Sequence, residues 1–125
     1  MINRGSIIAL AKLAGSLAVV VIAILSLIPG SIRPHLVAQP KLEHVAAYLL
    51  TAAFLTLGYG KDRYPTLIAA GLSVYSVILE IAQLGIPGRH AQVLDVVSSS
   101  IGAVIGCSLA WIALRTLSRT ATARP

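Results

Sequence analysis

Three sets of polar or small side chains recur at helical spacing in this chain. The sets are Lys41, His44 and Tyr48; then Ser73, Ser76, Glu80 and Gln83; and then Gln92, Asp95, Ser99, Gly102 and Gly106. Residues three and four positions apart lie on one face of a helix, so each set should form a stripe. A histidine beside a carboxylate can perform general acid–base chemistry, so His44, Glu80 and Asp95 are the candidate catalytic residues.

Two basic side chains near these stripes suggest a ligand. Lys41 and Arg89 are suited to phosphate, which an arginine can bind through two parallel hydrogen bonds. We therefore expect a ligand-binding site formed by Lys41, His44, Tyr48, Glu80, Gln83, Arg89, Asp95 and Ser99. Gly102 and Gly106 form a Gly-x-x-x-Gly pattern, which lets a neighbouring helix backbone approach closely, and we expect them to serve helix packing.

No motif in the sequence is dedicated to a metal or another cofactor, and we expect neither. His44, Glu80 and Asp95 could chelate a metal only if the fold brought all three within about 2 to 2.5 Å of one ion. The single cysteine, Cys107, excludes an intramolecular disulfide and lies in an apolar run. We expect it to be an inert packing residue.

Composition places the chain among integral membrane proteins. Of its 125 residues 57% are hydrophobic and 11% are charged, whereas soluble domains carry about 25% charged residues. The formal net charge is +6, but the basic residues are spread between apolar runs and form no stripe for nucleic acid. Basic loops beside membrane lipids are the simpler explanation.

Four apolar runs are long enough to cross a bilayer, which needs about 20 helical residues. We expect spans at about 6–28, 41–57, 65–84 and 92–114, separated by segments rich in glycine and proline, and a tail at 115–125. A signal peptide is the alternative for the first run, but no small-x-small cleavage pattern follows it. The predicted fold is an all-α membrane protein, a single domain over 1–114 with four antiparallel transmembrane helices.

The basic residues predict the orientation of this bundle. Seven of the ten lie on the side that holds both termini, namely Arg4, Lys12, Lys61, Arg63, Arg115, Arg119 and Arg124. By the positive-inside rule, both termini and the tail are cytoplasmic. The candidate site then lies at the extracytoplasmic end, together with all three histidines.

Three segments carry a resemblance to a known family. KLEHVAAY at 41–48, EIAQ at 80–83 and RHAQVLDVVSSSIGAVIG at 89–106 resemble the VanZ-like family of small bacterial membrane proteins. Ser99 stands where that family usually has asparagine, which removes an amide donor and acceptor. The resemblance implies a multi-helix protein of the bacterial cytoplasmic (inner) membrane, with some relatives linked to glycopeptide resistance. It implies no particular reaction.

Three functions remain open at this point. The polar site could bind an anionic lipid or a cell-envelope precursor, with membrane lipids as partners, which is the function we expect. Alternatively, the chain could be an accessory or assembly subunit of a larger membrane protein complex, in which the polar cluster only braces the helices. The third possibility is a membrane enzyme acting on a phosphate-bearing lipid, with His44 as a base.

Overall fold

The computed structural model describes residues 3–35, 38–60 and 64–122, and this part of the chain contains four α-helices and no strand. They are α1 (Arg4–Leu27), α2 (Pro40–Tyr59), α3 (Tyr64–Gln83) and α4 (Val93–Thr122). All four are long and apolar enough to cross a membrane. The prediction of a four-helix transmembrane fold is confirmed.

Local chemistry explains where the helices begin and end. The side chain of Asn3 accepts a hydrogen bond from the Ser6 backbone N–H at 2.8 Å and caps the start of α1. Pro40 occupies the first turn of α2, where its missing N–H costs nothing. Between α3 and α4, Gly88 adopts a φ of 73°, which glycine tolerates best.

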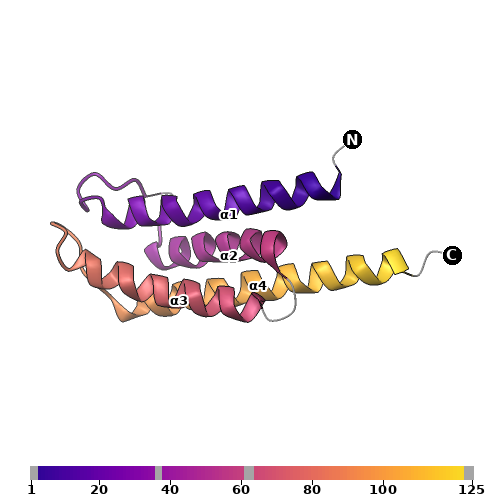
Figure 1. Cartoon of the computed structure of the whole chain (residues 1–125). Coiled ribbons are helices and arrows are strands. Elements are labelled where there is room, and N and C mark those ends of the chain that lie inside the picture. The colour runs from indigo at the N-terminus through magenta and orange to yellow at the C-terminus, as the bar shows by residue number, and fades with distance from the viewer. Residues whose placement is uncertain (1–2, 36–37, 61–63, 123–125) are drawn as a thin grey trace.

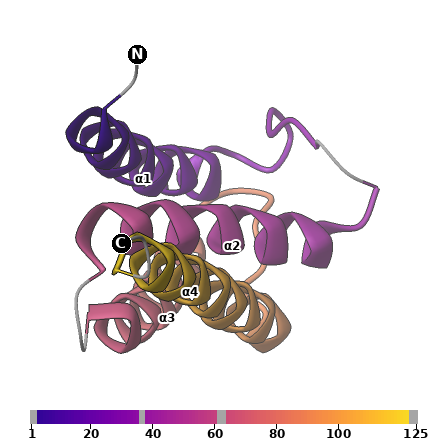
Figure 2. The ribbon, with the colours of Figure 1, turned by 90° about the vertical axis from the view of Figure 1, so that its right-hand side faces the viewer.

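Helix α2 lies between α1 and α4, and α3 lies beside α4 (Figures 1 and 2) and also contacts α1. In the described part of the chain, α2 packs against α1 on one side and α4 on the other, while α3 packs mainly against α4 and α1 makes no contact with α4. Successive helices are antiparallel. The most extensive contact is therefore between α2 and α4, which run in the same direction (Figure 1).

Small residues allow α2 and α4 to approach closely. Gly102 lies against the backbone of Val45, and a Cβ added there would collide with the Val45 carbonyl oxygen. Gly106 lies against Leu49 in the same way, one turn further along both helices. Both glycines thus contact the backbone of a neighbouring helix, the arrangement that a Gly-x-x-x-Gly pattern permits.

The outward surface is apolar around the bundle. Leu10, Leu17 and Ile24 on α1 are each more than half exposed, as are Ile78 on α3 and Leu109 on α4. Exposed apolar faces on helices of this length indicate a surface that contacts lipid. The chain is a multi-pass membrane protein, and the cytoplasmic placement of its termini stays a prediction.

Most predicted boundaries differ from the structure by at most two residues, and the C-terminal one is the exception. The segment 115–125 was expected to be a tail, but its described part, to Thr122, continues α4. Arg115 stacks over the Trp111 ring at 4.0 Å, and Thr116 donates a hydrogen bond to the Ala113 carbonyl. Of the residues used to predict orientation, Lys61, Arg63 and Arg124 lie outside the described residues.

Candidate functional site

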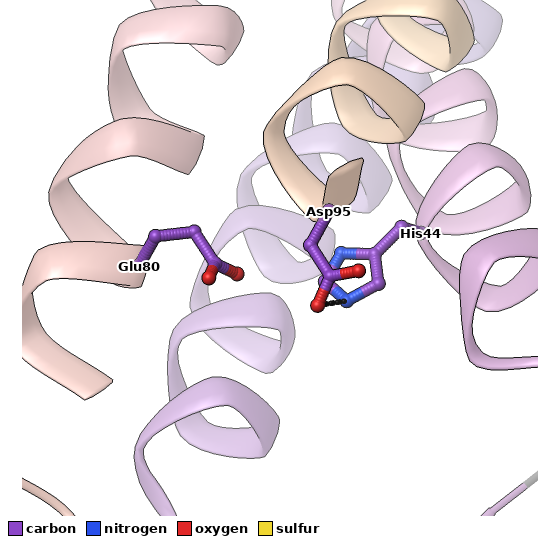
Figure 3. A group of neighbouring side chains, drawn as sticks. All are labelled: His44, Glu80 and Asp95. Carbon is purple, nitrogen blue, oxygen red and sulfur yellow. Dashed lines mark ion pairs between the residues drawn. The ribbon is translucent and has the colours of Figure 1, made fainter. Parts of the chain in front are cut away.

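Side chains from three helices converge at one end of the bundle. His44 comes from α2, Glu80 from α3 and Asp95 from the first turn of α4, and their polar atoms face one another (Figure 3). One ligand atom from each lies within 4.8 Å of the other two. The three candidate catalytic residues are therefore neighbours in space, although up to 51 positions separate them in sequence.

His44 lies between a carboxylate and a hydroxyl. Its Nε2 is 3.5 Å from Oδ2 of Asp95, and its Nδ1 is 3.2 Å from Oγ of Ser99. Asp95 and Ser99 are four residues apart on α4, so one face of that helix contacts both ring nitrogens. Ser99 is fully buried, with 0% of its surface exposed. Ser99 therefore orients the imidazole, and a substrate could not reach it as a nucleophile.

Lys41 lies at the rim of this cluster. Its Nζ is 2.5 Å from Oδ1 of Asp95 and also donates to Oε1 of Gln92. The Lys41 side chain is 38% exposed, whereas that of Asp95 is only 13% exposed. The ammonium group of Lys41 therefore neutralises the Asp95 carboxylate from the solvent side. Lys41 lies about one helical turn before His44 in α2.

Glu80 faces the cluster from α3 and is 6% exposed. Its Oε2 accepts a hydrogen bond from the Gln92 backbone N–H at 2.8 Å. Gln92 immediately precedes α4, and a carboxylate is stabilised beside the positive end of a helix dipole. The start of α4 thus positions Glu80 as well as Asp95, which lies in its first turn.

The polar contacts continue from His44 into the core. The Tyr48 side chain lies near Ser99 on α4 and Ser76 on α3. Tyr48 and Ser76 are each only 2% exposed. These contacts join α2, α3 and α4 below the ionisable groups, so Tyr48 belongs to the support of the site.

Two residues expected in the site have other partners. Arg89 donates from Nη2 to the carbonyls of Ser26, at 2.9 Å, and Leu25, and from Nε to that of Ile28 at 3.3 Å. Gln83 donates to the Ser26 carbonyl at 3.1 Å. Helix α1 has no basic residue in its last turn, so Arg89 supplies the cation that its C-terminus favours. Arg89 and Gln83 therefore cap α1, and Arg89 also lies close enough to Glu80 and Asp95 to interact with their charges.

Desolvation also affects the Arg89 guanidinium. Burial lowers its pKa from the usual arginine value, but arginine remains protonated in proteins at neutral pH. The positive charge at the end of α1 is therefore permanent. It holds the connection between α3 and α4 against α1, next to a hydrogen bond from the Gly30 N–H to the Pro87 carbonyl.

An arginine that the sequence analysis did not select lies beside the cluster. Arg33, in the connection between α1 and α2, pairs with Glu43 at 3.0 Å, and both side chains are largely buried. Arg33, Glu43 and His44 form the polar end of a pocket of about 220 Å³ between α1 and α2. Its apolar lining includes Ile22, Leu25, Ala46 and Leu50. The only sequence signal for Arg33 was its place among the few basic residues at this end.

Comparison of the sequence with models of known protein families identifies the family of this chain. The family model described as VanZ/LLP1 matches residues 10–114. The chain belongs to the VanZ/LLP1 family. The match begins in α1 and continues to Leu114 in α4, so it includes every member of the cluster. No match to the chain was found among the curated proteins or among the solved structures. The VanZ-like assignment made from the sequence is confirmed.

Proposed function

We propose that this VanZ/LLP1 protein binds the headgroup of an anionic membrane amphiphile, a phospholipid or a lipid-linked envelope precursor, at its extracytoplasmic end. The observation that carries the proposal is the pocket between α1 and α2. One end of this pocket is polar, with Arg33, Glu43 and His44, and the remainder is largely apolar. A pocket divided in this way matches a molecule with a charged head and a hydrocarbon tail.

The position of the apolar part supports a ligand that enters from the bilayer. Leu50 is 55% exposed, and Ala46 is exposed beside it on the lateral face of α2. Ile22 on α1 forms part of the opposite wall and is buried. An acyl or prenyl chain can therefore lie between α1 and α2 while it stays in contact with the surrounding lipid.

The charges at the polar end favour phosphate over a neutral headgroup. Glu43 contacts Nη2 of Arg33, but a guanidinium carries five N–H donors in a fork that matches phosphate. Arg33 therefore takes the role that the sequence analysis gave to Arg89. Lys41, which is paired with Asp95, lies partly exposed at the same end of the bundle.

Native mass spectrometry of protein purified in a mild detergent tests this proposal. We expect an anionic lipid to remain bound in preference to added phosphatidylcholine. Arg33→Gln should weaken its retention by about 10- to 100-fold, because hydrogen bonds to charged groups contribute about 1.5–3 kcal/mol. Ala46→Trp should exclude the tail by filling the pocket.

Arg119→Gln is the matched control, because Arg119 is exposed near the opposite end of the bundle. This variant should retain the lipid. Unchanged lipid in both pocket variants would contradict the proposal. A protein partner that copurifies in stoichiometric amount, without bound lipid, would instead support the accessory-subunit function.

A further inference from the structure

We propose that His44, Glu80 and Asp95 form a binding site for a divalent transition-metal ion, and that Zn²⁺ fits it best. The three side chains come from three different helices and face a common centre (Figure 3). The site rests on the geometry of these ligands alone and does not require the amphiphile proposed above.

The distances are close to those that a metal requires. Zinc bonds to nitrogen and carboxylate oxygen are about 2.0–2.2 Å long, so two ligand atoms of a tetrahedral site lie roughly 3.4 Å apart. Nε2 of His44 and Oδ2 of Asp95 are already 3.5 Å apart. One ligand atom of each of the three residues lies within 4.8 Å of the other two. Glu80 must approach by at most about 1.4 Å, which rotation of its flexible side chain can provide.

Each ligand is held through an atom that the metal does not need. Ser99 contacts Nδ1 of His44, so Nε2 faces the carboxylates. The Gln92 N–H holds Oε2 of Glu80, and Lys41 holds Oδ1 of Asp95, which leaves the second oxygen of each carboxylate toward the centre. Metal ligands are commonly oriented by such outer hydrogen bonds.

The charges of the cluster also favour a cation. Two carboxylates from neighbouring helices face each other in a largely buried place, and Lys41 is bonded to Asp95. A divalent ion at the centre would replace the carboxylate repulsion with two attractions. One imidazole and two carboxylates suit Zn²⁺, whereas Mg²⁺ and Ca²⁺ prefer oxygen ligands throughout. Three protein ligands would leave a fourth position open, and His44 also lines the pocket between α1 and α2.

Zinc titration of the chelator-treated protein, residues 1–125, tests the site. Isothermal titration calorimetry with ZnCl₂ should give one tight site per chain and raise the unfolding temperature, while the same concentration of MgCl₂ should do neither. Glu80→Gln keeps an acceptor for the Gln92 N–H but should weaken zinc binding by at least about 100-fold. The double variant His35→Ala/His90→Ala removes exposed histidines away from the cluster and should keep the site.

Lys41→Ala separates a metal site from a simple brace, because it leaves all three ligands in place. A cation beside Asp95 repels a metal, so its removal should tighten zinc binding by about tenfold. Zinc should then restore the unfolding temperature that the variant loses. Zinc binding that disappears in His35→Ala/His90→Ala, or that neither Glu80→Gln nor Lys41→Ala alters, would overturn the proposal. No binding by the wild-type protein would overturn it as well.

Discussion

Replacing Arg89 tests whether this residue supports the fold or binds a ligand. The sequence alone made Arg89 a phosphate-binding residue. In the structure its guanidinium reaches three carbonyls at the C-terminal end of α1. We therefore expect Arg89→Ala to destabilise the protein and to release the end of α1, while the pocket at Arg33 keeps its ligand.

The magnitude follows from the contacts. A hydrogen bond to a charged group contributes about 1.5–3 kcal/mol, and three bonds from one guanidinium are not additive. Arg89 is partly exposed, so water can replace some of them. We expect a loss of about 2–4 kcal/mol in the free energy of unfolding. Arg89→Lys keeps a cation near the helix terminus and should recover about 0.3–1 kcal/mol of that loss, because a lysine lacks the planar fork.

Two measurements in detergent check this expectation. Thermal unfolding reports the loss of stability, and hydrogen exchange reports opening of the backbone near Leu27, where α1 ends. Exchange should accelerate there and not at Leu49, in the interface between α2 and α4. Arg119→Ala, an exposed arginine on α4, is the control and should change neither quantity.

Two results would refute the reasoning. If Arg89→Ala unfolds at the wild-type temperature but no longer retains an anionic lipid, then Arg89 is a ligand-binding residue after all. In that case the contacts with α1 are incidental to stability. If stability and lipid retention both remain at the wild-type level, the capping role is wrong and the ligand role gains no support.

Three other predictions use different parts of the molecule. Gly102→Ala should destabilise the protein by about 1–3 kcal/mol, because the added Cβ would collide with the backbone of Val45. Gly71→Ala should not, because a Cβ there would have no atom within 4 Å. Equal unfolding temperatures of the two variants would contradict this prediction. Tyr75→Phe loses a 2.7 Å hydrogen bond between α3 and α1 and should cost about 0.5–1.5 kcal/mol on thermal unfolding, so an unchanged midpoint would count against it. After Cys107→Ala, a cysteine at position 39 should react with an impermeant label from outside the cell, and labelling only from the cytoplasm would reject the predicted orientation.

The sequence was sufficient for the fold because membrane helices have a strong apolar signal. Runs of about 20 apolar residues ended at glycine and proline, and the structure places helices at each of them. The prediction ended the last span at about residue 114, where polar residues begin, and gave the following segment as a tail, whereas α4 continues to Thr122. Arg115, stacked on Trp111, belongs to this continuation of α4.

The candidate site was only partly predictable for a related reason. Helical spacing shows which residues share a face, so His44 and the Asp95–Ser99 stripe could be placed opposite each other. Spacing does not show which helix lies beside each face. Gln83 and Arg89 face α1, whose backbone carbonyls carry no sequence signal. Backbone partners of this kind can be found only in a three-dimensional structure.

The pairing of α2 with α4 has a consequence for how the protein is made. The most apolar 18-residue stretch of α2 is less apolar than that of any other helix, and α2 pairs most extensively with α4, which the ribosome synthesises last. Until α4 emerges, the α2 surface around Val45 and Leu49 lacks the α4 glycines that it packs against in the folded protein. His44 likewise lacks its hydrogen-bonding partner Ser99. During that interval α1 covers the opposite side of α2, and α3 makes only a small contact with it. A nascent chain that stops before Val93 must therefore either remain beside the translocon or expose this polar surface to lipid.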